Sequence, residues 1–249
     1  MKLLIALILG VLSIPVFQSD SQDELVYYPL DHGNAAFLKV TGKDLYLFNT
    51  GHESDRYDLY HQLEEWEGYR LRGIIITQQN THNCGNIDFL INTYDVEQLI
   101  VPGSLNESCA VDHQDVKQVN LKQHPVTQIT EDYTVRYEAS YNGDGGNVEL
   151  KRGRFTAYWY ETSAVADRNE RVTFVYLPSY IYEEDLSIEF LDRLDPRVAV
   201  IQEKAKMKQM RLLNEILSKE WIEAFFLTKN LSVHVEVGDG PYRIFLVRR

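Results

Sequence analysis

The sequence predicts an α/β protein in which two sheets pack face to face and carry helices on their outer sides, an αβ/βα four-layer sandwich. Two observations support this. Short apolar stretches alternate with helical patterns in two regions of the chain, as in sheets with helices packed on them. Each of these regions follows a stretch rich in strand patterns, so the chain divides into two similar halves.

The first half opens with three strand patterns and continues as alternating helices and strands. Leu59, Leu63 and Trp66 share one helical face, which predicts a helix over Asp58–Glu67. Gly73–Thr77 is almost wholly apolar, which is typical of a strand covered on both faces. The predicted strands are Glu24–Tyr28, Ala35–Val40, Leu45–Phe48, Gly73–Thr77 and Gln98–Val101, and a second helix is predicted at Ile87–Tyr94.

The second half repeats this order. Asn142–Gly146 predicts a tight hairpin turn, because Asn and Gly adopt positive φ at little cost. Leu212, Leu213 and Ile216 are spaced for one face of a helix. The predicted strands are Val126–Ser140, Asn147–Arg152, Arg154–Tyr160, Val172–Leu177, Val198–Gln202, Ala224–Leu227, Ser232–Val237 and Tyr242–Val247, and the predicted helices are Asp185–Leu194 and Lys206–Lys219.

The composition of the 249 residues is that of a globular protein, with 44% hydrophobic and 25% charged residues. This excludes a disordered tail, a collagen and a polytopic membrane protein. The chain has 25 Lys and Arg against 37 Asp and Glu, a net charge of −12. Binding to a phosphate backbone is mostly electrostatic, so nucleic acid is not expected as a partner.

The N-terminus resembles a secretory signal. Lys2 precedes the apolar run Leu3–Phe17, and polar residues begin at Gln18. The run is short for a membrane-spanning helix, which needs about 20 residues. We expect residues 1–22 to be a signal peptide or an uncleaved N-terminal anchor, and residues 23–249 to form one extracytoplasmic domain. The alternative is a buried N-terminal helix or strand.

The segment Gly73–Asn86, GIIITQQNTHNCGN, resembles the signature of the metallo-β-lactamase fold, an apolar strand followed by T-H-x-H-x-D-H-x-G-G. Other landmarks of that family follow in the expected order, and the set is closest to the extracytoplasmic domain of the ComEC competence protein and its free-standing relatives. These landmarks are LDHGNAAFL at Leu30–Leu38, LYLFNTG at Leu45–Gly51, IVPG at Ile100–Gly103 and FLDRLDPRVAVI at Phe190–Ile201.

The resemblance also shows where this sequence departs from the family. The family's ligands His, His, Asp and His are replaced at these positions by Gln78, Asn80, His82 and Asn83. The strand-end Asp becomes Asn49, and the bridging Asp falls near Glu161. The last motif, H-H-G-S, would fall near Pro178–Tyr180, which contains no His.

Neutral amides are poor ligands for zinc, which prefers imidazole, thiolate and carboxylate groups. The resemblance therefore implies a retained fold with degenerate metal motifs and no cofactor. We expect a non-catalytic protein that binds a small ligand or an envelope protein and meets the membrane only through its N-terminal segment.

The alternative is a metal-dependent hydrolase of phosphoester or nucleic-acid substrates with a rearranged zinc or manganese site. The residues for such a site are His52, His82, His113 and Glu161, with Glu53 and Asp55 nearby. In an active site of this kind the metal lowers the pKa of a bound water and makes it a nucleophile. Surface histidines and carboxylates are often inert, which favours the non-catalytic interpretation.

The resemblance also suggests a disulfide. Cys84 follows the strand Gly73–Thr77 and Cys109 follows the strand Gln98–Val101, and the family topology places these two loops side by side. A bond between them would bridge the mouth of the former metal site and stabilise the fold by about 3 kcal/mol. An extracytoplasmic location permits such a bond. The alternative is two separate buried thiols.

Overall fold

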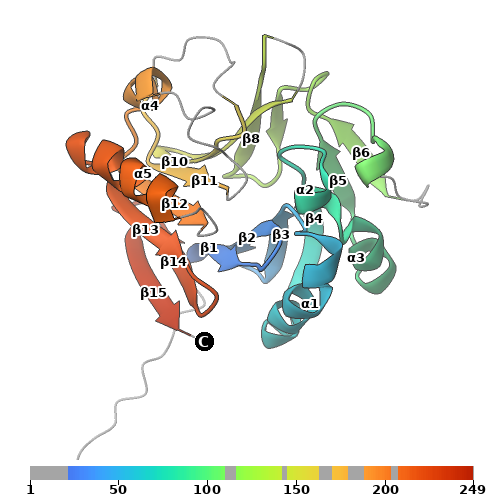
Figure 1. The fold of residues 1–249 in the computed structure, drawn as a ribbon. Coiled ribbons are helices and arrows are strands. Elements are labelled where there is room, and N and C mark those ends of the chain that lie inside the picture. The colour runs from blue at the N-terminus through green and yellow to red at the C-terminus, as the bar shows by residue number, and fades with distance from the viewer. Residues whose placement is uncertain are drawn as a thin grey trace, which may run out of the picture.

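The computed structural model describes residues 22–109, 116–141, 145–162, 170–178, 188–202 and 207–248. In this part of the chain two mixed sheets face each other, with helices on their outer sides (Figure 1). This confirms the predicted αβ/βα four-layer sandwich.

The first sheet has the strand order β15-β14-β1-β2-β3-β4-β5-β6. Its strands pair antiparallel from β15 to β3 and parallel from β3 to β6. They are β1 (Asp23–Pro29), β2 (Asn34–Val40), β3 (Asp44–Phe48), β4 (Arg70–Ile75), β5 (Gln98–Val101), β6 (Lys117–Asn120), β14 (Leu231–Val237) and β15 (Arg243–Arg248).

The second sheet has the order β13-β12-β11-β10-β9-β8-β7, antiparallel from β7 to β10 and parallel from β10 to β13. Its strands are β7 (Val126–Gln128), β8 (Thr134–Ala139), β9 (Gly146–Arg152), β10 (Phe155–Trp159), β11 (Phe174–Leu177), β12 (Val198–Gln202) and β13 (Glu223–Leu227).

Helices α1 (Arg56–Glu65) and α3 (Ile87–Thr93) lie outside the first sheet, and α4 (Ile188–Leu194) and α5 (Met207–Lys219) lie outside the second (Figure 1). The short helix α2 (Thr81–Cys84) and the 3-10 turns η1 (Glu53–Asp55) and η2 (Glu107–Cys109) follow strands of the first sheet. The polar residues of the candidate site lie in these short elements and in the adjoining loops.

The core between the sheets is aromatic. Phe48 stacks on Trp159 with ring centroids 4.2 Å apart, and Tyr27 stacks on Tyr176 at 5.6 Å. All four side chains are buried, and aromatic contacts of this kind stabilise a core beyond the area that they bury. Because Phe48 and Trp159 end β3 and β10, their stacking fixes the loops that follow these two strands.

The prediction of one strand over Val126–Ser140 is wrong, because a turn divides it into β7 and β8. The hydroxyl of Thr130 accepts hydrogen bonds from the backbone N–H groups of Asp132 and Tyr133, and the N–H of Ile129 donates to the carbonyl of Tyr133. Such local side-chain bonds compete with strand pairing.

The sequence did not predict β6 or α2. The sequence of β6, KQVN, is mostly polar and has no strand pattern, yet it pairs in parallel with β5 over four residues. Residues 142–144 of the predicted hairpin lie outside the described part, but β8 and β9 on either side of it pair antiparallel. The starts of the helices predicted at Asp185 and Lys206 also lie outside it.

Residues 1–21, which include the predicted signal or anchor, are not among the described residues. Among the residues that are described, no helix has both the length and the apolar character to span a membrane.

Glu24 on β1 is expected to make stability depend on pH. Its carboxylate accepts hydrogen bonds from Lys39 Nζ at 2.8 Å and His234 Nδ1 at 2.6 Å. Burial raises the pKa of Glu24, but these bonds together outweigh it and lower the pKa from 4.5 to about 2. A lowered pKa stabilises the fold above the unfolded value of 4.5, and this contribution disappears as the pH falls toward 2.

Replacing Glu24 with Gln should therefore lower the free energy of unfolding at pH 7 by about 2 kcal/mol, allowing for partial solvent screening. It should also flatten the pH dependence between the two pKa values. Denaturant unfolding across this pH range measures both effects. The control Glu67→Gln, at an exposed position just after α1, should change neither. An unchanged pH profile in the Glu24 variant would contradict the prediction.

Candidate functional site

Four polar side chains form a closed hydrogen-bonded network where β3 and β4 end. The amide of Asn49 donates to Asn34 Oδ1 at 2.6 Å and to Thr77 Oγ1 at 2.9 Å. Asn34 donates to Asn83 Oδ1 at 2.7 Å, and Asn83 donates back to Thr77 Oγ1 at 3.3 Å. All four residues are buried. Two of them occupy degenerate motif positions of the family resemblance, Asn83 at a metal-ligand position and Asn49 at the position of the strand-end Asp.

Glu161 joins this network to the second sheet. The Thr77 hydroxyl donates to Glu161 Oε1 at 2.5 Å, and the backbone N–H of Glu161 donates to Asn147 Oδ1 at 2.7 Å. Glu161 is nearly buried, and its negative charge adds to burial in raising the pKa of Tyr176 well above its usual value. Glu161 is thus the charged group of an otherwise neutral set.

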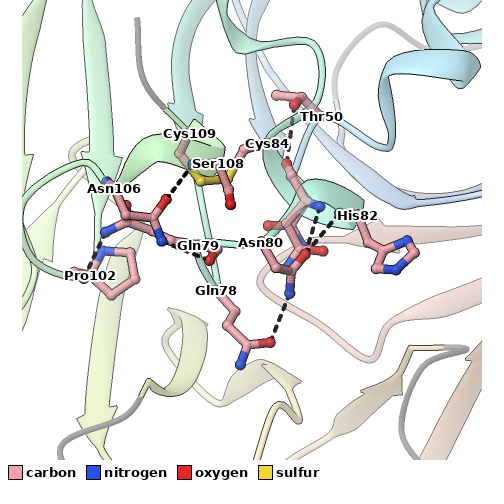
Figure 2. Close-up of a disulfide and its surroundings, with 12 residues drawn as sticks. Thr50, Gln78, Gln79, Asn80, His82, Cys84, Pro102, Asn106, Ser108 and Cys109 are labelled. Carbon is pink, nitrogen blue, oxygen red and sulfur yellow. Dashed lines mark hydrogen bonds between the residues drawn. A yellow bond between two sulfur atoms is a disulfide. The ribbon is translucent and has the colours of Figure 1, made fainter.

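The next motif position, Asn80, caps α2. Its Oδ1 accepts the backbone N–H groups of His82 at 2.9 Å and Asn83 at 3.0 Å, the usual role of Asn before a helix. Its amide nitrogen donates to Gln78 Oε1 at 2.9 Å, so Gln78 turns toward Asn80 (Figure 2). The two side chains are half-buried and hydrogen-bond within the motif itself.

Gln79 and a disulfide hold the loop after β4 against the loop after β5. Gln79 Nε2 donates to the carbonyls of Pro102 and Ser104, and Gln79 Oε1 accepts the N–H of Asn106 at 2.8 Å. Cys84 at the end of α2 is bonded to Cys109 at the end of η2, with 5.1 Å between their Cα atoms (Figure 2). The structure therefore supports the disulfide rather than two separate thiols.

Three histidines, His32, His52 and His82, lie close together at the edge of this network, and we call this group the rim. The rings of His32 and His52 have centroids 5.9 Å apart, and those of His52 and His82 are 6.0 Å apart. They come from the β1–β2 loop, the β3–η1 loop and α2. His32 was not predicted as a site residue, although its polar neighbours at a strand end could have indicated it.

Neighbouring groups fix the hydrogen-bonding roles of these rings. His32 Nδ1 lies 3.2 Å from the buried carboxylate of Asp55, and His82 Nδ1 lies 2.6 Å from the carbonyl oxygen of His32. Because both partners are acceptors, these two Nδ1 atoms carry the proton and donate. His52 Nδ1 instead accepts the N–H of Ser54 at 3.2 Å. The rim thus presents Nδ1 atoms in both donor and acceptor roles.

Close backbone packing brings the rim together. A Cβ atom on Gly33 would lie 2.3 Å from His52 N and 2.4 Å from the carbonyl oxygen of His82. A Cβ atom on Gly85 would lie 2.3 Å from Glu53 N. Only glycine permits such a close approach of three backbone segments.

Of the residues of the rearranged metal site, the structure brings His52 and His82 together at the rim, whereas Asp55 and Glu53 bind other groups. Asp55 accepts the backbone N–H groups of His32 and His52 at 3.0 and 3.1 Å, and Glu53 pairs with Arg56 at 3.6 Å. His113 is outside the described residues. Within the described ranges, no group of three or more His, Cys, Asp and Glu side chains is placed to hold a metal ion. The donors that are described do not fit a zinc centre, which requires several anionic or imidazole ligands around one point.

Removing one amide from the network should destabilise the fold. Asn83→Leu deletes the acceptor of the Asn34 amide and a donor to Thr77. A buried donor without a partner costs about 1–3 kcal/mol. We expect a loss of this size in the free energy of unfolding, measured by denaturant titration.

Asn92→Leu, on the exposed side of α3, is the matched control. It should cost much less, and an equal loss in the two variants would show that the network adds no stability.

No family model matches the chain, and no curated protein matches it. Solved structures do match. The metallo-beta-lactamase fold protein YhfI from Bacillus subtilis is 9% identical with a TM-score of 0.61, and the match covers 86% of this chain and 99% of YhfI. A diphosphatase from the PhnP family is 12% identical with a TM-score of 0.52, and the match covers 88% of this chain and 85% of the diphosphatase. Identities this low establish a shared fold alone, and on this basis the chain has the metallo-β-lactamase fold.

Proposed function

We propose that this chain is a degenerate, non-catalytic member of the ComEC-like group of the metallo-β-lactamase fold that binds a partner or ligand outside the cytoplasm. The observation that carries the proposal is the closed network of Asn34, Asn49, Thr77 and Asn83. Asn83, at a metal-ligand position, and Asn49, at the strand-end Asp position, both bond to Thr77 in this network.

The chemistry of the network argues against a metal ion. Asn49 Oδ1 accepts the backbone N–H of Thr77 at 2.9 Å, and Asn83 Oδ1 accepts the Asn34 amide. A cation at this point would have to break these bonds in a buried place, where each unpaired polar group is costly. Glu161 alone supplies a carboxylate to the network, too little charge to compensate for that loss.

The rim and the nearby amides of Gln78 and Asn80 suit a small polar ligand. Gln78 and Asn80 supply amides, and His32, His52 and His82 supply imidazoles. These groups can both donate and accept hydrogen bonds. Such a surface can recognise a small polar molecule or the polar end of an envelope protein.

Two further observations support the proposed ComEC-like group and the proposed extracytoplasmic location. The landmarks of the ComEC-like group follow in order along the chain, from Leu30–Leu38 to Phe190–Ile201. Disulfides such as Cys84–Cys109 persist mainly in oxidising compartments. We therefore place the domain outside the cytoplasm, where its N-terminal segment would be a removed signal or the membrane anchor.

The competing proposal is a zinc- or manganese-dependent hydrolase built on His52, His82, His113 and Glu161. The approach of the His52 and His82 rings favours it, and the structural similarity to a diphosphatase makes phosphoesters its natural substrates. The bond from Thr77 to Glu161 disfavours it, because the carboxylate faces the network.

Hydrolysis assays separate the two proposals. The purified chain should not hydrolyse bis(p-nitrophenyl) phosphate or pyrophosphate above the blank, with or without added zinc or manganese. His82→Ala and Glu161→Gln should give the same blank rate. Turnover that chelation abolishes, and that both substitutions remove, would establish the hydrolase and overturn the non-catalytic proposal.

A further inference from the structure

The strand β15 exposes a run of apolar side chains at an edge of the first sheet, where no other described strand pairs with it. β15 pairs with β14 on one side and ends the sheet on the other (Figure 1). Its six residues pair with β14 in unbroken register. Phe245, Leu246 and Val247 are 42%, 51% and 40% exposed, so both faces of the strand carry exposed apolar groups.

The middle of this edge strand lacks the devices that usually protect edge strands. Proteins shorten such strands, bend them with bulges or place proline and charged residues along them. Of the other three edge strands, β7 has three residues, the four residues of β6 are mostly polar, and the apolar residues of β13 are buried or half-buried. β15 is longer and unbulged, and its four central residues are all apolar.

The charges at the ends of β15 indicate the chemistry of a partner. Arg243 and Arg248 flank the apolar run. Arg243 pairs with Glu236 and donates to Gln22, whereas Arg248 makes no ion pair with the residues that the structure describes. In a chain with a net charge of −12, Arg248 is a local positive charge at the end of this strand that attracts an acidic residue.

We propose that β15 accepts an extended segment of a partner protein as an additional strand of the first sheet. The segment would carry apolar residues at alternate positions and an acidic residue against Arg248. Backbone hydrogen bonds would supply affinity, and the side chains and the charge would supply selectivity. This inference is independent of the proposed function, because β15 contributes none of the network or rim residues.

Two other occupants fit less well. A second copy that paired antiparallel about the middle of β15 would place Arg243 opposite Arg248, and like charges opposite each other destabilise a sheet. A lipid surface cannot satisfy the free backbone N–H and C=O groups of the edge. An acidic extended peptide would bring an opposite charge to the arginines and could pair its backbone with the N–H and C=O groups of the edge.

The probe is a fluorescein-labelled peptide in which valine and threonine alternate, with a glutamate at each end. The full chain is titrated into this peptide, and binding is followed by fluorescence anisotropy. The comparison peptide has lysine in place of each glutamate. We expect saturable binding of the glutamate peptide and at least about tenfold weaker binding of the lysine peptide.

Two variants test the surface. Leu246→Ser removes an apolar contact, and Arg248→Glu reverses the charge; each should weaken binding of the glutamate peptide at least about tenfold. Val126→Ser, at a 60% exposed valine of the edge strand β7, should leave it unchanged. Thermal melting shows whether each variant is folded.

Three results would overturn the proposal. One is the absence of saturable binding at millimolar peptide. Another is equal binding of the two peptides, or equal effects of Leu246→Ser and Val126→Ser. The third is a concentration-dependent dimer, seen by light scattering, that Leu246→Ser dissociates, because the occupant of β15 would then be a second copy.

Discussion

Replacing Gly33 with alanine is expected to destabilise the fold by about 3 kcal/mol or more, because the added methyl group has no free space. The new Cβ would lie 2.3 Å from His52 N, 2.4 Å from His82 O and 2.5 Å from Gly51 Cα. All three contacts are with backbone atoms, which cannot turn away as a flexible side chain can. The loop that carries His52 and the helix α2 that carries His82 would have to move away from Gly33.

Denaturant unfolding at neutral pH measures this loss. Gly240→Ala is the matched control, since a Cβ there has nothing within 4 Å. Its free energy of unfolding should stay close to that of the wild type. A Gly33 variant as stable as the Gly240 variant would mean that the three segments are not packed as closely as described.

Removing the disulfide is expected to lower the free energy of unfolding by about 3 kcal/mol. Cys84 and Cys109 are separated by 25 residues, and closing a loop of this length restricts the unfolded chain. The bond also holds α2, a helix of four residues that carries His82 and Asn83. A helix this short depends on tertiary contacts for its stability.

The double variant Cys84→Ala and Cys109→Ala is compared with the wild type in the presence and absence of a reductant. Reduction should destabilise the wild type about as much as the double substitution does and should leave the variant unchanged. If the wild type contained two free thiols by mass spectrometry and did not respond to reductant, the disulfide would be disproved.

Much of the fold could be predicted because periodicity and buried apolar strands dominate its layers. Strands such as β5 and β12 are continuous apolar runs, which identify the central parallel parts of both sheets. β6 could not be predicted, because its pairing with β5 and not its own sequence makes it a strand. The turn within Val126–Ser140 depends on the Thr130 hydroxyl, a local bond that apolar patterns do not reveal.

The site was predicted less completely. The family resemblance pointed to Asn49, Gln78, Asn80, His82, Asn83 and Glu161, and the structure places Asn49, Asn83 and Glu161 in one hydrogen-bonded network with Thr77. The roles of Asn34 and His32 were not predicted. They depend on contacts with Asn83 and His82, which lie 49 and 50 positions away along the chain. Asn80 became a helix cap because α2 begins directly after it.

The central claim, that amides have replaced the metal ligands, is tested most directly by zinc binding. The full chain is purified, treated with chelator and titrated with zinc by calorimetry, and its metal content before chelation is measured by mass spectrometry. The network of Asn34, Asn49, Thr77 and Asn83 predicts no stoichiometric metal and no saturable binding. One zinc ion per chain, removed by chelation and lost in His82→Ala, would contradict it.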